Sequence, residues 1–234
     1  MGFANVGKDV GTSLYSAKQI MIAGKILQSK AASGDAAFGD GVYLTTMEHK
    51  YGIKTIMENN WDSVAATKED KLEAFFEILM PSNMAIRVKD KKDILVYKGD
   101  LKLVDYKWNL KRFDGELLAT QYFRVTSSER GGEMRRDCMG RYSLDSHAVT
   151  WHHDLNHVPV YKKDDGNKYL YLEGGRGEWV VGKVIGGNVC LLQQAKKKGE
   201  SPSPTPSKAL AWRYSDSSGW KDDATMKVYP FYPK

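Results

Sequence analysis

The sequence has no long apolar run: none approaches the roughly 20 residues that a membrane-spanning helix needs. Residues 1–8 also lack the long apolar stretch of a secretory signal peptide. We therefore expect a protein with no membrane partner, which acts in the cytoplasm, or is secreted if a leader was removed.

Cysteine is scarce as well. Cys138 and Cys190 are the only two cysteines, and they form neither a CxxC pair nor any spacing typical of metal ligands. Two free thiols in a reducing compartment are expected, and one disulfide within the C-terminal half is the alternative. The sequence also contains no P-loop, no dinucleotide-binding glycine fingerprint and no Ser-His-Asp arrangement.

The five histidines give no clear metal pattern. His153 and His157 are four residues apart and would align on a helix, but Asn156 and Pro159 favour a turn. No cysteine or carboxylate pattern supports them, so we expect a surface loop here and no metal.

Positive charge is present in excess but is not concentrated. The formal net charge is +6, and the only run of three lysines is at residues 196–198. Spread charge is typical of a solvated surface, so an anionic partner such as a nucleotide or nucleic acid is compatible with it but not indicated. The Pro- and Ser-rich residues 201–207 that follow predict an extended, solvated loop.

The length of 234 residues leaves room for one large domain or two small ones. The polar, glycine-bearing residues 127–132 indicate a boundary, with domains at 1–128 and 133–234. Short aromatic strands predict a small all-β second domain. They are expected at residues 158–161, 169–172, 179–184, 189–192, 211–214 and 226–229.

The first half mixes helical and strand patterns. A capping box formed by Ser16 and Gln19 starts a predicted helix over 17–29, and a second is expected over 48–61. Residues 42–45 and 94–97 predict strands, the latter continuing through Leu101 and Leu103. A helix over 67–76 and a strand over 75–80 fit the intervening segment equally well.

The chain is organised around residues 38–46, where Gly39 and Gly41 lead into an apolar strand. Glycine permits a tight turn and lets a ligand lie against the main chain. Tyr43, just beyond the turn, could offer its ring face to a flat ligand. The alternative is an ordinary turn that enters a core strand.

The order of these segments along the chain resembles that of a known protein family. Gly11, Thr12 and Ser13, then a helix, then Phe-Gly-Asp-Gly-Val-Tyr-Leu-Thr at 38–45, resemble the His-Tyr branch of the ADP-ribosyltransferases. That branch includes the poly(ADP-ribose) polymerases and a toxin-like class named for a His, a Tyr and an Asp. The resemblance covers residues 8–110. It implies an α+β fold, a split mixed β-sheet with flanking helices, here followed by the small all-β domain.

The resemblance also implies a site that binds NAD as a substrate. The backbone of Gly11 would hold the nicotinamide carboxamide and Tyr43 would stack on its ring, because a glycine backbone supplies one donor and one acceptor. The other cofactor-binding positions would be Val10, Thr12, Ser13, Gly39 and Gly41. The reaction would break the glycosidic bond to nicotinamide, and the acceptor of ADP-ribose could be a protein or a nucleic acid.

Two acidic residues are candidates for the remaining catalytic position. Asp93, before the strand at 94–97, is the best positional match, and Glu77 is the second candidate. Each has a plainer interpretation: Asp93 as a strand-edge residue beside two lysines, and Glu77 as a charge on a solvent-facing surface.

The chain departs from the family at Val10, where the branch has histidine. Losing that hydrogen bond to a ribose hydroxyl costs about 0.5–1.5 kcal/mol, roughly tenfold in affinity.

The sequence leaves three hypotheses for the function. An active transferase or NAD glycohydrolase is one hypothesis. A catalytically inactive protein on the same fold, which binds another flat aromatic molecule, is the second. A carbohydrate- or protein-binding role for the C-terminal module is the third.

Overall fold

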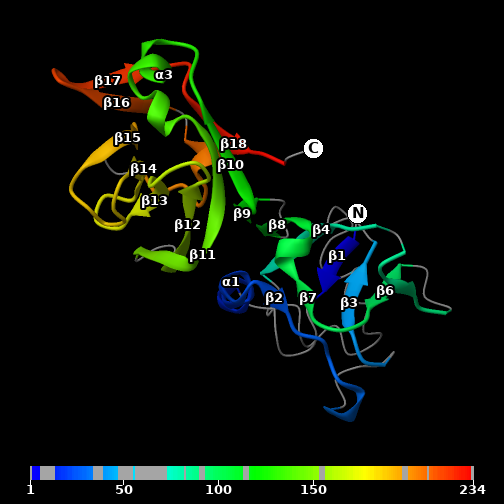
Figure 1. Ribbon diagram of the computed structural model, residues 1–234. Helices are drawn as coiled ribbons and strands as arrows, with labels where there is room; N and C mark the ends of the chain where they lie inside the picture. The colour runs from blue at the N-terminus through cyan, green and yellow to red at the C-terminus, as the bar shows by residue number, and fades with distance from the viewer. Residues whose placement is uncertain are drawn as a thin grey trace. The chain divides into compact units, whose positions relative to one another are not determined.

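A computed structural model describes residues 2–5, 14–33, 39–46, 55, 73–81, 83–89, 93–112, 116–152, 156–196, 200–209 and 211–232. The chain divides into two compact units, Met1–Leu118 and Ala119–Lys234, which are described separately (Figure 1). The division falls after Leu118, inside the strand Leu117–Thr120 that belongs to the sheet of the first unit, and the glycine-bearing residues 127–132 lie inside the second unit.

The first unit is built on a seven-stranded sheet with the order β5-β6-β3-β1-β4-β8-β9, and every neighbouring pair for which a register is given is antiparallel. The strands are β1 (Gly2–Asn5), β3 (Val42–Thr45), β4 (Ala74–Leu79), β5 (Ile86–Arg87), β6 (Ile94–Tyr97), β8 (Lys107–Arg112) and β9 (Leu117–Thr120). The other elements among the described residues are helix α1 (Leu14–Ala23), the two-stranded pair β2 (Lys25–Ile26) and β7 (Leu101–Lys102), and two 3-10 turns, Ala31–Ser33 and Leu103–Asp105.

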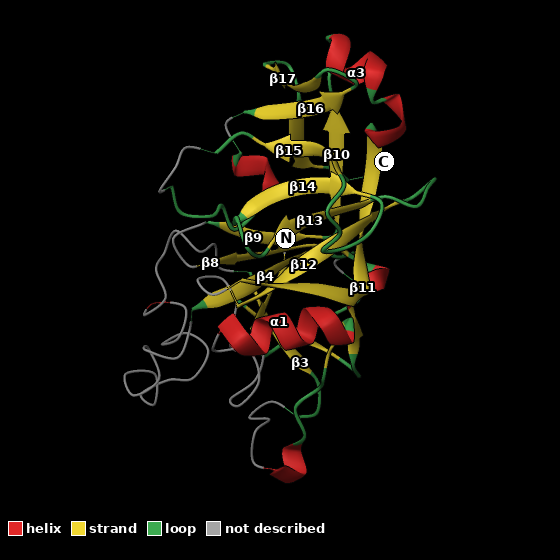
Figure 2. Cartoon of the chain, turned by 90° about the vertical axis from the view of Figure 1, so that its left-hand side faces the viewer, coloured by secondary structure: helices red, strands yellow, loops and turns green. Residues whose placement is uncertain are grey.

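One face of this sheet forms a hydrophobic core. Side chains alternate along a strand, so every second residue of β3, β4 and β8 lies on the same face. The buried residues on that face are Val42, Leu44, Ala74, Phe76, Ile78, Trp108 and Leu110. The rings of Phe76 and Trp108 meet edge to face, 5.7 Å apart. Helix α1 packs beside β4 and buries Ala17, Ile20 and Met21 (Figure 2).

The second unit is a nine-stranded antiparallel sheet that curls on itself, with the order β17-β16-β15-β14-β13-β12-β11-β10-β18 (Figure 1). Its strands are β10 (Tyr122–Thr126), β11 (Gly140–His152), β12 (Asn156–Lys163), β13 (Tyr169–Glu173), β14 (Glu178–Gly182), β15 (Cys190–Gln194), β16 (Trp212–Asp216), β17 (Gly219–Asp223) and β18 (Lys227–Pro230). Its helical turns are α3 (Arg130–Met134), Arg136–Cys138 and Pro206–Lys208.

Aromatic side chains fill the core of the second unit. The largest fully buried ones are Trp179, Trp212, Tyr142, Tyr161, Tyr171 and Phe123. Burial raises the pKa of Tyr171 to about 12 and raises the pKa of Tyr142 and Tyr161 as well, so all three stay neutral. These rings are core residues and are not available to stack on a ligand.

The expected α+β class is wrong. The described residues are mostly β-strand, with two short α-helices, and the strand pairs are antiparallel where a mixed sheet was expected. The helix expected over 17–29 ends at Ala23, because Gly24 turns the chain with a φ of 69°. The ambiguous segment is the strand β4, and the helix expected over 48–61 lies outside the described residues, apart from residue 55.

Two loop predictions need correction. In the segment at 151–157, expected as a surface loop, Trp151 and His152 pair with His157 and Asn156 as the ends of β11 and β12, and residues 153–155 lie outside the described residues. The segment at 201–207, expected to be solvated, packs on the core: Thr205 and Pro206 are buried, and Trp179 Nε1 donates to the Ser203 carbonyl at 2.8 Å. Both cysteines are free thiols, as expected.

Candidate ligand site in the first unit

The turn before β3 is held by two main-chain hydrogen bonds. Gly41 and Ser29 exchange N–H···O bonds of 2.9 and 3.0 Å. Close packing against β6 leaves no room for a side chain at position 41, because a Cβ there would overlap Val96 and lie 2.6 Å from the Tyr97 carbonyl oxygen. Gly39 has a φ of 88°, a conformation that glycine adopts without strain.

Charged side chains hold the tip of the same turn. The Asp40 carboxylate accepts from the Ala31 N–H at 2.7 Å and pairs with Lys30 at 3.5 Å. Lys98 Nζ donates to the Asp40 carbonyl at 3.0 Å. The Ala31 N–H, with further help from Lys30 and Lys98, lowers the pKa of Asp40 below its ordinary value. Asp40 therefore stays ionised at neutral pH and keeps the turn closed.

Tyr43 is fixed by the turn that precedes it. Its hydroxyl donates to the Gly39 carbonyl at 2.8 Å, which ties the ring to its own loop. The side chain is half-buried, unlike its neighbours Val42 and Leu44, which belong to the core on the other face. A ring held at both ends and partly exposed is pre-organised for stacking on a flat ligand.

The register of the sheet places Glu77 on the same face as Tyr43. Phe3 of β1 lies opposite Thr45 on one side and Glu77 on the other, so Glu77 shares the face of Tyr43. One strand separates β3 from β4. Tyr43 and Glu77 are therefore about 10 Å apart across the sheet and about 7 Å apart along it.

Glu77 forms a polar cluster with Asn109 and Lys111. Its Oε2 accepts from Asn109 Nδ2 at 2.9 Å and pairs with Lys111 Nζ at 2.9 Å. The side chains of Glu77 and Lys111 are only 15% and 21% exposed. A partly buried carboxylate with charged and amide partners can hold ribose hydroxyls or stabilise developing positive charge.

Asp93 has a different position. Its carboxylate accepts from Thr46 Oγ1 at 3.1 Å, and its carbonyl accepts from the Thr46 N–H at 2.9 Å. It lies three residues along the β3–β6 pair from Tyr43, about 10 Å away, where strand alternation favours the other face. The structure thus gives Asp93 a role in joining the ends of two strands, and it brings Glu77 to the face of Tyr43.

The structure brings three of the predicted residues together, namely Gly39, Gly41 and Tyr43. Val10, Gly11, Thr12 and Ser13 lie outside the described residues. Sequence reasoning missed Asn109 and Lys111. Their signal was the alternation of polar and apolar residues over 107–112, which is typical of a strand with one buried face.

Comparisons with known proteins return no match: no protein-family model, no curated protein and no solved structure is similar to this chain. Within the described residues, no helix is long and apolar enough to cross a membrane. The same part of the chain holds no cluster of three or more His, Cys, Asp or Glu side chains suited to a metal ion.

Proposed function

We propose that the first unit binds NAD, or a flat aromatic molecule like it, across the sheet face between Tyr43 and Glu77. The observation that carries this is the fixed, partly exposed ring of Tyr43 on the same face as a partly buried carboxylate.

In this proposal Tyr43 stacks on the nicotinamide ring, and Glu77 faces the adjacent ribose. Heterolysis of the glycosidic bond sends both bonding electrons to the pyridinium nitrogen, so neutral nicotinamide leaves. The negative charge of Glu77 stabilises the oxocarbenium-like sugar that remains. Water or an acceptor hydroxyl then attacks the anomeric carbon and loses a proton, which completes glycohydrolysis or ADP-ribosyl transfer.

The alternative is a binding protein that releases no nicotinamide. Val10 supports it, because valine cannot donate a hydrogen bond to the second ribose. The ion pair between Glu77 and Lys111 supports it too, since a nearby ammonium offsets the negative charge that the reaction would use. Both versions use the same ring and the same face, and they differ only in whether the glycosidic bond breaks.

The variant Tyr43→Ala is expected to weaken NAD binding about 5- to 150-fold, because stacking of a base on an aromatic side chain contributes about 1–3 kcal/mol. Isothermal titration calorimetry of both proteins measures this directly. Tyr43→Phe is the matched control: it keeps the ring, loses the bond to the Gly39 carbonyl, and should stay within about threefold of the unchanged protein.

Two outcomes would contradict the stacking role. One is equal NAD affinity for Tyr43→Ala and the unchanged protein. The other is a loss in Tyr43→Phe as large as that in Tyr43→Ala, which would assign the effect to the hydroxyl and the turn.

A further inference from the structure

The second unit carries a surface on which cations alternate with aromatic rings. Strands β12, β11, β10 and β18 are neighbours, and their outward residues form what we call the basic-aromatic face. Its cations and aromatic rings are Tyr122, Arg124, Arg141, Lys162, Lys227, Tyr229 and Phe231, and the same side of the strands also carries Thr126, Ser143 and Asp145. The opposite side of the same strands carries the buried residues Phe123, Tyr142, Tyr161 and Val228, which fixes the outward direction of the face.

Like charges meet at the centre of this face. Arg124 lies directly opposite Arg141 on the neighbouring strand, an arrangement that costs stability when nothing neutralises it. Arg141 pairs with Asp164. Among the described residues, no carboxylate forms an ion pair with Arg124, although it is exposed and next to two aromatic positions. An anion at this point would relieve the repulsion.

The two guanidinium groups lie over aromatic rings. Arg124 is 4.9 Å from the centre of the Phe231 ring, and Arg141 is 5.4 Å from that of Tyr122. Stacking of this kind orients the guanidinium plane and leaves its outer side available for a base. Tyr229, directly opposite Arg124 on β18, is 39% exposed and adds a further ring.

The face is held by buried contacts at the start of β18. Asp223 is 2% exposed and accepts from the Thr225 and Met226 N–H groups at 3.0 Å each. It also accepts from Ser127 Oγ at 2.7 Å, which ties the start of β18 to the end of β10. The positions of Arg124 and Tyr229 are therefore set by the scaffold, and a ligand would meet a preformed surface.

We propose that the basic-aromatic face binds single-stranded nucleic acid. Cations that track phosphates, interleaved with flat groups that stack on bases, are the features that recognise a single strand on a sheet. A sulfated glycan would pair with the cations, but it has no planar bases to stack on the rings. A lipid surface would need apolar side chains that project outward, and Phe231 and Tyr122 lie half-buried beneath guanidinium groups. This surface is separate from the NAD proposal, because all its residues belong to the second unit.

The test is fluorescence anisotropy of a labelled 12-nucleotide oligouridylate, titrated with the full chain at several salt concentrations. The variant Arg124→Ala should weaken binding at least fivefold and reduce the slope of log K against log salt by about 1. Tyr229→Ala should also weaken binding at least fivefold while leaving that slope unchanged, because a lost stacking contact carries no charge.

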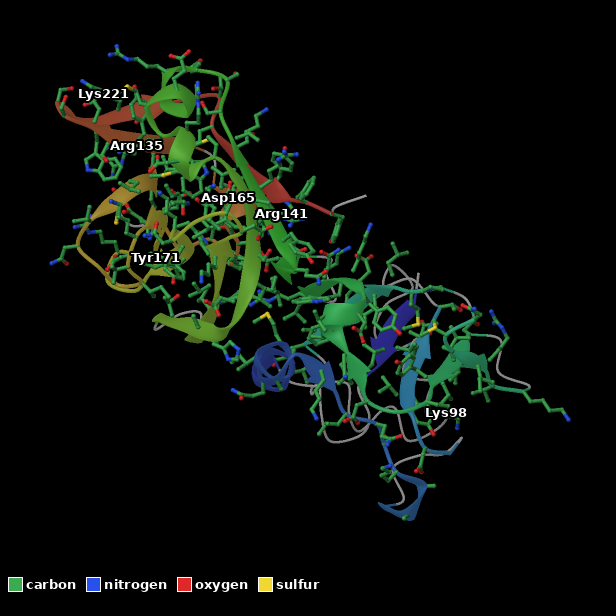
Figure 3. All side chains as sticks on the ribbon, in the orientation of Figure 1. Lys98, Arg135, Arg141, Asp165, Tyr171 and Lys221 are labelled. Carbon is green, nitrogen blue, oxygen red and sulfur yellow. The ribbon has the colours of Figure 1, made fainter. Side chains whose placement is uncertain are left out.

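Lys221→Ala is the matched control. Lys221 is exposed on β17, at the other end of the strand order, and Figure 3 shows it well away from Arg141. This variant removes one positive charge but should change the affinity less than twofold. Melting curves of all three variants should match that of the unchanged protein, since each substitution is on the surface.

Several results would overturn the proposal: no saturable binding of the oligonucleotide at 50 mM salt, equal losses for Lys221→Ala and Arg124→Ala, or no effect of Tyr229→Ala. Tighter binding to heparin or to phosphatidylserine vesicles than to the oligonucleotide, with Tyr229→Ala without effect on either, would reassign the face to a glycan or a lipid surface. A duplex bound as tightly as the single strand would also contradict the stacking role.

Discussion

Replacing Trp179 with alanine is expected to lower the free energy of unfolding of the second unit by about 4 kcal/mol. Trp179 is fully buried in the main core of this unit, against neighbours that include Leu172 and Trp212. Its indole N–H also donates to the Ser203 carbonyl, and this hydrogen bond helps to attach the Pro- and Ser-rich segment to the core. The substitution therefore leaves a cavity and an unpaired carbonyl together.

Urea denaturation followed by circular dichroism measures this loss, and Trp179→Phe separates its two parts. Phenylalanine fills most of the cavity and removes the N–H, so it should cost about 1–2 kcal/mol. In this variant, hydrogen exchange should speed up at residues 200–208 while the strands stay protected. A loss below about 1 kcal/mol for Trp179→Ala would mean that this tryptophan is not a core residue.

Gly41→Ala is expected to destabilise the first unit by about 3 kcal/mol, the upper end for overpacking, because a backbone oxygen stands in the way. The added Cβ would lie 2.6 Å from the Tyr97 carbonyl oxygen and would also overlap Val96. Either β3 separates from β6 or the bridge between Ser29 and Gly41 opens. Both changes release the turn that fixes Tyr43, so ligand binding should fall with stability.

Gly24→Ala is the comparison variant for chemical denaturation. Gly24 also has a positive φ, of 69°, but a Cβ there meets nothing within 4 Å. It should cost only about 1 kcal/mol, from backbone conformation alone. Equal losses for the two variants would show that the close approach of β3 to β6 does not dictate glycine at position 41.

Local patterns predicted the strands that carry a clear signal. Apolar, β-branched residues at 42–45 and 94–97 indicated β3 and β6, and the structure contains both. The segment at 74–79 stayed ambiguous because its phenylalanines suit a buried helix and a buried strand equally. Strand β11 was missed because its mixture of Gly, Ser, Asp and His has low intrinsic strand propensity, and its pairing with β12 overrides this.

The candidate site could be predicted only in part. Gly39, Gly41 and Tyr43 adjoin in the sequence, so one motif identified them. That Glu77 shares their face depends on β1, a four-residue strand in a glycine-bearing segment that gave no strand pattern. The register between distant strands is set by tertiary pairing, which no local pattern encodes. Asp93 was preferred to Glu77 because of its position along the chain. Position along the chain does not tell which face of the sheet a residue occupies.

The basic-aromatic face escaped prediction for the same reason. Its cations are dispersed over four strands between residues 122 and 231, so no run of charge marks them. The longest lysine run, 196–198, is evident in the sequence because its residues are adjacent. Antiparallel pairing gathers Arg124, Arg141 and Tyr229 into one row, and that row exists only once the sheet has formed.

The most direct test of the proposed function is calorimetric titration of the full chain with NAD, with free nicotinamide assayed in the same sample. We expect saturable binding of one NAD per chain. Nicotinamide release would identify an active transferase or glycohydrolase, and its absence would identify a binding protein. No heat of binding up to millimolar NAD would contradict the proposed site between Tyr43 and Glu77.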